Sequence, residues 1–201
     1  MRQETGANSF AAYEKSVSIQ LPLGGHSFSV ETIPADARPL FEVITPRTTL
    51  VPLDVFDAGA CEAFLSAAGL ACCSGETAVT CGMTDGAVAV AAIDAECLQA
   101  LRGRFGDKLT LLCPLCRQTD MDSDTVTLFR AGDILYIKVY GNGKLRFAEA
   151  VEAAGDAAIV ELLQNIEQQL GFGRYMFLCS GDGAKAMRKL LKRFYRNVKC
   201  E

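Results

Sequence analysis

Alternating apolar and polar residues mark the first part of the chain. Residues 17–21 and 26–33 alternate with a period of two, and Gly24 and Gly25 separate them. Because a strand turns successive side chains to opposite faces, this pattern predicts two strands joined by a tight turn. A third short strand is predicted at residues 41–45, with a helix after it.

The next segment changes from helical to strand patterns and back. Apolar residues at helical spacing after Pro52 predict a helix. Residues 78–83 and 87–93 flank a glycine turn and predict a further hairpin. Asp94 suits the N-cap of another helix, and residues 109–112 then form a buried strand.

The second half of the chain starts again with strands. Three alternating segments predict an antiparallel meander over residues 125–130, 134–140 and 144–151. Asp156 is expected to cap the helix that follows, and Gly171 to end it. A short apolar strand then leads to a last helix. The apolar stripe of this helix is Met187, Leu190, Leu191, Phe194 and Val198.

Both halves therefore run strand, strand, strand, helix, strand and helix, with an extra hairpin in the first. Antiparallel strands followed by helix crossovers predict an α/β fold with mixed sheets and helices packed on them. Residues 118–124 lack an apolar period and form the predicted linker. We expect lobes at residues 17–117 and 125–201, after an N-terminal extension at residues 1–16.

Composition narrows the class of protein. Hydrophobic residues make up 50% of the 201 residues and charged residues 22%, enough apolar material for a sizeable core. No stretch approaches the roughly 18 apolar residues of a membrane-spanning helix, and the N-terminus lacks a signal-peptide pattern. We therefore expect a cytoplasmic protein whose nine cysteines are free thiols.

This order of elements resembles the ribonuclease H-like unit, and two such units in tandem resemble the actin-like ATPase fold. Residues 17–21 with 26–29, and residues 49–56, resemble an uncharacterised bacterial family of actin-like-fold proteins with no assigned activity. The resemblance implies a cleft between two ribonuclease H-like lobes. It also implies ATP with Mg²⁺ as the cofactor of active relatives.

The resemblance further implies three nucleotide-binding turns, which are a phosphate loop in each first hairpin and an adenosine turn before a late helix. Glycines are present at all three places, and glycine frees backbone amides to hold phosphate. Plain hairpin geometry explains the same glycines. The candidate residues are Gly24 and Gly25, then Gly141, Asn142, Gly143 and Lys144, and finally Gly181, Asp182 and Gly183.

Active members of the actin-like superfamily place an aspartate at each phosphate loop. This chain has Gln20 and Leu21 at the first loop and Tyr140 at the second. Since Mg²⁺ and a general base both require a carboxylate, the sequence favours a non-catalytic protein. Such a protein would act through a protein partner, or bind nucleotide without turnover. The alternative is an ATPase or phosphotransferase that uses Asp182 and Asp85 instead.

Cysteine spacing gives two weaker candidates. Cys113 and Cys116 have the spacing of a thiol redox pair, but they end a strand rather than open a helix. Zinc needs four ligands, of which Cys113 and Cys116 could supply two, with Cys72 and Cys73 or Cys61 supplying the others. The adjacent Cys72 and Cys73 cannot easily both reach one tetrahedral ion. Structural packing is therefore favoured, and we predict neither a catalytic residue nor a metal site.

A run of basic residues is the strongest polar signal in a chain of net charge −4. These residues either form the solvent face of the last helix or bind an anionic surface as an adaptor. Nucleic acid is disfavoured because no stacking aromatic residues accompany them. The residues are Lys185, Arg188, Lys189, Lys192, Arg193, Arg196 and Lys199.

Overall fold

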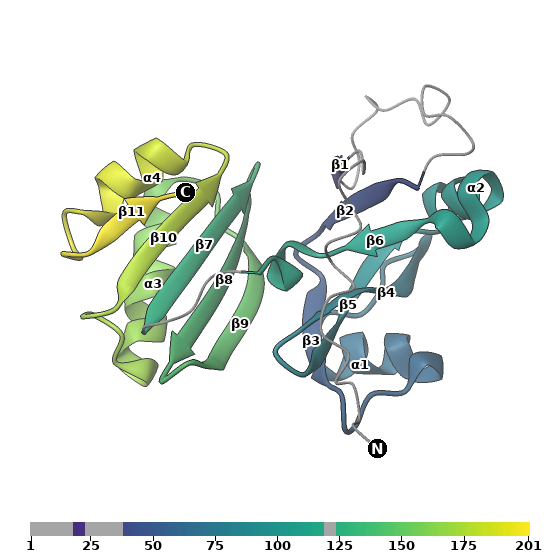
Figure 1. Ribbon diagram of the computed structural model, residues 1–201, viewed down its shortest axis with the longest axis horizontal. Helices are drawn as coiled ribbons and strands as arrows, with labels where there is room; N and C mark the ends of the chain where they lie inside the picture. The colour runs from purple at the N-terminus through teal and green to yellow at the C-terminus, as the bar shows by residue number, and fades with distance from the viewer. Residues whose placement is uncertain (1–17, 23–37, 119–123) are drawn as a thin grey trace, which may run out of the picture.

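The computed structural model describes residues 18–22, 38–118 and 124–201. Its elements form two lobes that lie side by side (Figure 1). The N-terminal lobe contains β1 (Ser18–Pro22), β2 (Leu40–Ile44), β3 (Thr48–Pro52), η3 (Ala58–Ala60), α1 (Cys61–Ala67), β4 (Glu76–Thr84), β5 (Ala87–Asp94), α2 (Ala95–Phe105), η4 (Gly106–Lys108), β6 (Thr110–Leu112) and η5 (Pro114–Cys116). The C-terminal lobe contains β7 (Thr125–Ala131), β8 (Ile134–Gly141), β9 (Lys144–Glu152), α3 (Asp156–Leu170), β10 (Met176–Gly181), α4 (Ala184–Leu191) and β11 (Val198–Cys200).

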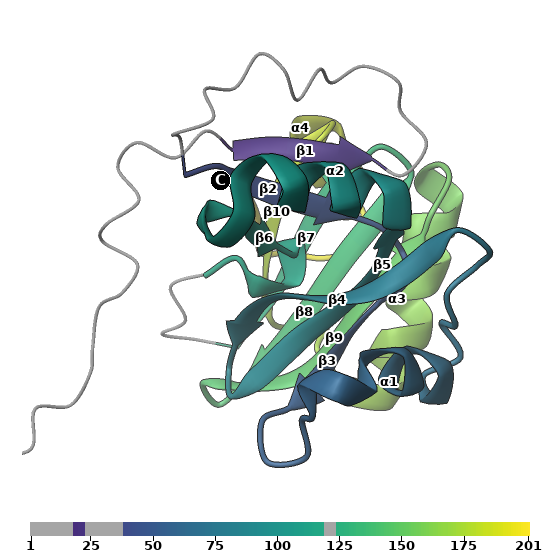
Figure 2. The same ribbon diagram turned by 90° about the vertical axis from the view of Figure 1, so that its right-hand side faces the viewer.

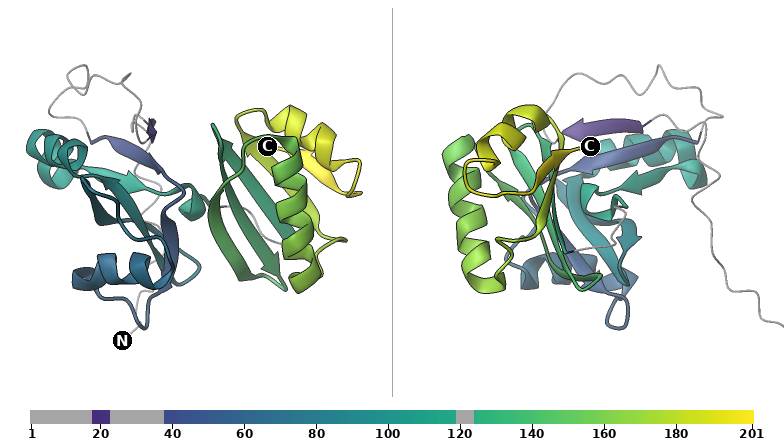
Figure 3. Two further views of the ribbon diagram at one scale, coloured as in Figure 1. Left: turned by 180° about the vertical axis from the view of Figure 1, so that it is seen from behind. Right: turned by 60° about the vertical axis from the view of Figure 1, so that its left-hand side comes forward.

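The C-terminal lobe is a single five-stranded sheet with the order β11-β10-β7-β8-β9. The meander β7-β8-β9 is antiparallel, whereas β10 runs parallel to β7 and β11 parallel to β10. Helices α3 and α4 cover the face away from the N-terminal lobe (Figures 1 and 3). Leu128, Ile137 and Phe177 of the sheet pack there against Leu163 and Leu191 of the two helices. The predicted mixed sheet with packed helices is confirmed.

The N-terminal lobe divides its strands between two three-stranded sheets. Strands β1, β2 and β6 are parallel, and α2 packs against them through Leu101 and Phe105, which contact Phe41. Strands β3, β5 and β4 are antiparallel, and α1 covers them through Leu65. Figure 2 shows the two helices at opposite ends of this lobe.

The first sheet of the N-terminal lobe differs from the predicted antiparallel meander. Strands β1 and β2 are parallel neighbours. A parallel pair needs a crossover of a dozen or more residues, and the segment at residues 23–39 is long enough to make one. The strand predicted at residues 26–33 lies outside the described residues.

Three further predictions for this chain were wrong at particular residues. Residues 48–52 form β3 rather than the approach to a helix, because they pair with β5 from Thr48 opposite Ala91 to Pro52 opposite Ala87. The last helix ends at Leu191, and Val198 belongs to β11, where it pairs with Phe177. The expected N-cap at Asp156 is also shifted, since Gly155 holds that position without a side-chain bond.

A shared apolar core joins the lobes. Ile44 and Leu115 from the N-terminal lobe pack in one cluster with Phe129, Tyr136 and Ala150 from the C-terminal lobe. The sheet of the C-terminal lobe is thus covered by helices on one face and by the N-terminal lobe on the other. Within the described residues, no helix is both long and apolar enough to cross a membrane.

Candidate functional site

The predicted nucleotide-binding turns do not lie together. Gly141, Asn142, Gly143 and Lys144 belong to the β8–β9 turn, at the end of β8. The turn at residues 181–183 lies beside the start of β8 instead, as shown below. These two turns are therefore separated by the length of β8, on the order of 20 Å at 3.3 Å per residue. Gly24 and Gly25 lie outside the described residues.

Contacts within the chain account for the glycine turn at residues 181–183. The Asp182 backbone N–H donates to Arg130 O at 2.8 Å, and the Gly132 N–H donates to Asp182 Oδ2 at 2.8 Å. Gly181 has φ +79°, and a Cβ there would stand 2.1 Å from Arg130 O. The glycine is required by this close approach of two backbones.

The first hairpin of the C-terminal lobe is β7–β8, so its turn is Gly132-Asp133 and not the β8–β9 turn. Arg130 is the last residue but one of β7 and donates from Nε to Gly132 O at 2.8 Å, with Nη2 at 3.8 Å from Asp133 Oδ1. The β7–β8 turn thus places a guanidinium beside its own acid, Asp133. A cation at this position opposes Mg²⁺.

The alternative pair of acids is no better placed. Asp85 lies in the β4–β5 turn and accepts from Tyr140 Oη at 2.8 Å, near the end of β8. Asp182 lies near the start of β8, so the two carboxylates cannot share one ion. Among the residues described, no three His, Cys, Asp or Glu side chains are grouped to hold a metal. The described residues therefore do not fit Mg²⁺ with ATP.

Polar side chains instead concentrate at the junction between the lobes. Tyr136 Oη accepts from the Thr45 N–H at 2.8 Å and donates to Thr45 O at 3.1 Å. Burial raises the pKa of the Tyr136 phenol, so the hydroxyl remains a donor at neutral pH. One buried hydroxyl thus satisfies both backbone groups of a residue in the other lobe.

A partly buried ion pair lies beside this contact. Arg117 Nε and Nη2 donate to Glu42 Oε1 and Oε2 at 2.6 and 2.8 Å. Glu42 is 2% exposed, in the middle of the apolar strand β2. The Arg117 guanidinium carbon lies 4.0 Å from the centroid of the Phe129 ring, which comes from the other lobe. This bidentate pair is therefore fixed by stacking as well as by charge.

Lys138 is the third charged group of the junction. Its side chain is 3% exposed, and Nζ donates to Arg117 O at 2.6 Å. Burial lowers the pKa of this ammonium. The adjoining cleft has a volume of about 30 Å³ and is lined by Arg117, Thr127, Lys138 and Ser180, among others. Since ligand pockets span roughly 300–1,000 Å³ and a water needs roughly 10–15 Å³, this cleft is too small for a nucleoside.

The cysteine pair lies in the core beneath η5. Cys113 and Cys116 are buried, and Cys81 is buried beside them. Burial raises the pKa of Cys116 to about 12. The hydrogen bond with the Cys113 thiol, together with burial, raises the pKa of Cys81. Because the thiolate is the nucleophile, these thiols have the character of packing residues.

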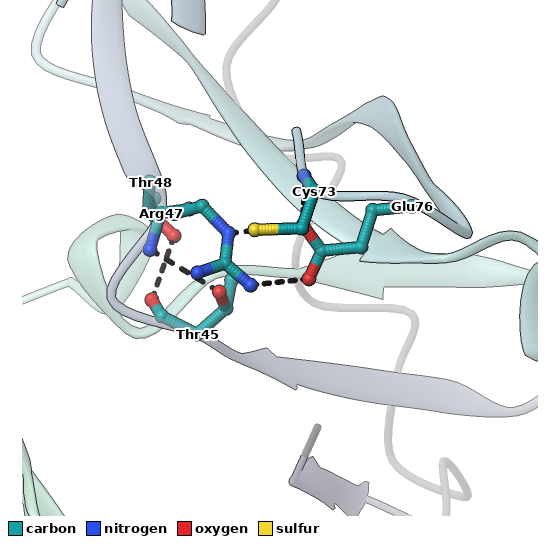
Figure 4. Close-up of polar contacts among 5 residues, drawn as sticks. All are labelled: Thr45, Arg47, Thr48, Cys73 and Glu76. Atoms are coloured by element: carbon teal, nitrogen blue, oxygen red, sulfur yellow. Dashed lines mark hydrogen bonds and ion pairs between the residues drawn. The ribbon is translucent and has the colours of Figure 1, made fainter. Parts of the chain in front are cut away.

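Cys73, one of the two adjacent cysteines, belongs to a polar cluster that the sequence did not predict (Figure 4). Arg47 Nε donates to Glu76 Oε2 at 3.0 Å, and Nη2 pairs with Oε1. The Cys73 N–H donates to the same Oε2 at 2.8 Å, which fixes the loop before β4. Thr48 Oγ1 donates to Thr45 O at 3.0 Å. The cluster holds β3 to β4 and leaves Cys72 half-buried at its edge.

The seven predicted basic residues are all exposed. Lys185, Arg188 and Lys189 lie on α4, and Lys192 and Arg193 follow at its C-terminal end. Arg196 and Lys199 lie beyond the helix, the latter on β11. The ion pairs of the described chain are those of Arg47, Arg117 and Arg130, so none of the seven is paired there.

Comparison with known proteins adds the fold and no activity. No family model and no curated protein matches the chain. A solved structure from Bacteroides thetaiotaomicron, described as a protein with actin-like ATPase fold and unknown function, superposes with a TM-score of 0.67 at 15% identity. The match covers 82% of this chain and 68% of that one. A PilM-PilN type IV pilus biogenesis complex gives 0.45 at 14% identity, with coverages of 81% and 68%.

At such identities the likeness concerns the fold alone. The chain has an actin-like ATPase fold, as the duplicated order of elements predicted.

Proposed function

We propose that this protein is a non-catalytic binding protein that uses its actin-like fold as a scaffold. Its basic face, defined as Lys185, Arg188, Lys189, Lys192 and Arg193, receives an acidic surface of a partner protein. The carrying observation is the separation of charge. Residues 185–199 hold seven of the 20 Lys and Arg and none of the 24 Asp and Glu, which leaves 13 cations against 24 acids in the rest.

Helical geometry collects these cations on one side. Positions 185, 188, 189, 192 and 193 share one face at 100° per residue, while Met187 and Leu191 are buried on the other. Unpaired like charges on one short segment repel one another. An acidic partner relieves this repulsion and gains electrostatic attraction in approach and docking.

A groove of mixed lining adjoins the basic face. It lies between α3 and α4 and has a volume of about 400 Å³. Its apolar residues include Val160, Leu190 and Phe194, and its polar residues are Asp156, Glu161, Gln164 and Arg193. Phe194 is 47% exposed. Since aromatic side chains in a concave patch are typical anchors of protein interfaces, an acidic segment with an apolar side chain suits both features.

Two observations support a protein without turnover. Arg130 lies on β7 beside the β7–β8 turn, and the acids Asp85 and Asp182 lie at opposite ends of β8. Nucleotide binding with Mg²⁺ is the alternative proposal.

Fluorescence anisotropy with a labelled oligoglutamate peptide bearing one phenylalanine tests this proposal. We expect saturable binding that the triple reversal Lys185→Glu, Arg188→Glu, Lys189→Glu weakens by at least about tenfold. The matched control reverses Arg102 and Lys108, two exposed cations of the N-terminal lobe, and should keep the affinity.

The competing anionic partners are arms of the same experiment. Vesicles containing phosphatidylserine and a DNA duplex replace the peptide at equal charge. The proposal is overturned if either of them binds in a way that depends on the basic face while the peptide does not. It is also overturned if the peptide binds the triple variant as tightly as the native chain.

A further inference from the structure

Two charged residues, Glu42 and Lys138, are buried at the lobe junction, and only Glu42 contacts an opposite charge among the described residues. Arg117 is neutralised by Glu42 through two hydrogen bonds. Lys138 remains, and its hydrogen bond goes to a neutral carbonyl, Arg117 O. Asp85 and Glu201 favour the charged form of Lys138 through space, but neither forms an ion pair with it in the described part of the chain. The junction therefore holds one ammonium without a contacting anion.

A buried charge of this kind is costly. Removing an ion from water carries a penalty of several kcal/mol unless an opposite charge and hydrogen bonds compensate it. An ammonium has three N–H donors, and the described residues use one of them. Lys138 Nζ also lies 5.4 Å from the centroid of the Tyr140 ring, and an anion in the space beside the ammonium would add an opposite charge.

The cleft beside Lys138 offers such a space. Thr127 lies directly opposite Lys138 in the β7–β8 register, and Ser180 lies on the neighbouring strand β10. Both hydroxyl side chains line the cleft with Lys138 and Arg117. Ser180 Oγ has a weak bond to Leu128 O at 3.4 Å, so it can turn to a better acceptor. A volume of about 30 Å³ admits about two waters.

We propose that this cleft binds one phosphate-sized oxyanion, with Lys138 Nζ as its charged donor and the hydroxyls of Thr127 and Ser180 as neutral donors. The site selects inorganic phosphate or sulfate by size and charge. It lies on the sheet face toward the N-terminal lobe, away from α3 and α4. An anion here would tie β7, β8 and β10 to η5 and stabilise the junction. The proposal is independent of the partner on the basic face.

Isothermal titration calorimetry of the full chain with inorganic phosphate tests it, with sodium chloride at matched ionic strength as the blank. We expect saturable one-to-one binding at millimolar phosphate. Lys138→Met should weaken it by at least about tenfold, and Thr127→Val by less. Lys108→Met removes an exposed lysine of η4 and should leave the affinity unchanged. Glu201→Gln removes an acid from the cleft rim and should tighten binding.

Two results would overturn the proposal. One is the absence of saturable heat with both phosphate and sulfate. The other is binding that survives Lys138→Met, which would indicate an adventitious ion on the surface. ATP without Mg²⁺ distinguishes a free oxyanion from a phosphoryl group, since tighter binding of ATP than of phosphate would contradict a cleft of this size. If Lys138→Met does not fold, the other two variants still test the proposal, because Thr127→Val should weaken phosphate binding and Glu201→Gln should tighten it.

Discussion

Each lobe contains its own set of three parallel strands, and the lobes differ in the elements around these strands. In the C-terminal lobe the parallel strands are β7, β10 and β11, and α4 directly precedes the last of them. In the N-terminal lobe they are β1, β2 and β6, with α2 and the short η4 before the last. The C-terminal lobe extends this core with the hairpin partners β8 and β9. The N-terminal lobe inserts β3, α1, β4 and β5 between its second strand and α2.

This difference determines how the apolar core is divided between the two lobes. The C-terminal lobe buries one face of a continuous sheet under two helices, so its apolar core is large. The N-terminal lobe divides its apolar residues among smaller clusters, and one of them is completed only by the other lobe. We therefore expect the stability of the N-terminal lobe to depend on the C-terminal lobe more than the stability of the C-terminal lobe depends on the N-terminal lobe.

The largest expected effect is a cavity in the C-terminal core. Phe177 is fully buried and stacks on Tyr195 with centroids 4.1 Å apart. Phe177→Ala should lower the free energy of unfolding by about 3–5 kcal/mol in urea denaturation. The control is Phe194→Ala, because Phe194 is an exposed aromatic of the same lobe and should cost less than about 1 kcal/mol. Equal losses would show that the core does not control stability.

The two glycine turns at opposite ends of β8 provide a matched pair. Gly181 and Gly143 both have positive φ, but a Cβ would clash with Arg130 O only at Gly181. Gly143→Ala should cost about 1–2 kcal/mol, from backbone strain alone. Gly181→Ala should cost more, because a backbone must also move. Thermal unfolding compares the two variants, and a larger loss at Gly143 would contradict the contact geometry.

The junction should respond to loss of a single hydroxyl. Tyr136→Phe leaves the Thr45 N–H without its partner in a buried site, so we expect a loss of about 1–3 kcal/mol. Tyr140→Phe removes a bond to Asp85, an exposed acid, and should cost less. The test is hydrogen exchange across both lobes. Faster exchange of Thr45 in Tyr136→Phe than in Tyr140→Phe is the expected result, and the reverse order would exclude this role.

The smallest expected effect is a pH dependence in the N-terminal lobe. The hydrogen bond with Arg47 lowers the pKa of Glu76 from its ordinary 4.5. Glu76 therefore stabilises the fold fully above pH 4.5, and this contribution is lost as pH falls through the lowered folded-state pKa. Glu76→Gln should reduce stability at pH 7 and flatten the decline in acid, as measured by urea midpoints. An unchanged acid slope would argue against this ion pair.

Local signals in the sequence predicted the elements that depend on neighbouring residues. The helix α2 begins after Asp94, whose Oδ1 accepts from the Cys97 N–H at 2.7 Å as expected of an N-cap. The meander of the C-terminal lobe and α3 follow the same logic, because alternation and the 3.6-residue period are local. The resemblance to actin-like proteins then predicted the actin-like ATPase fold, and the similar solved structure confirmed it.

Elements that depend on distant partners were missed. Strand β11 is three residues long and exists because Val198 pairs with Phe177 of β10. The Tyr136 hydroxyl reaches a residue 91 positions away, and Arg117 reaches one 75 positions away. One signal was present in the sequence. Glu42 and Lys138 each interrupt an apolar strand, Lys138 within the run Ile134–Val139. A charge in such a position indicates a buried polar contact, but the sequence does not show which residue the contact reaches.

The most direct test of the central claim is thermal unfolding of the full chain with and without excess Mg²⁺-ATP. A native-state ligand at 100 times its Kd adds about 2.7 kcal/mol of stability. We predict an unchanged midpoint at millimolar nucleotide, because Arg130 lies beside the β7–β8 turn and the carboxylates of Asp85 and Asp182 lie at opposite ends of β8. A reproducible rise, accompanied by phosphate release that Arg130→Asp increases, would contradict a non-catalytic scaffold.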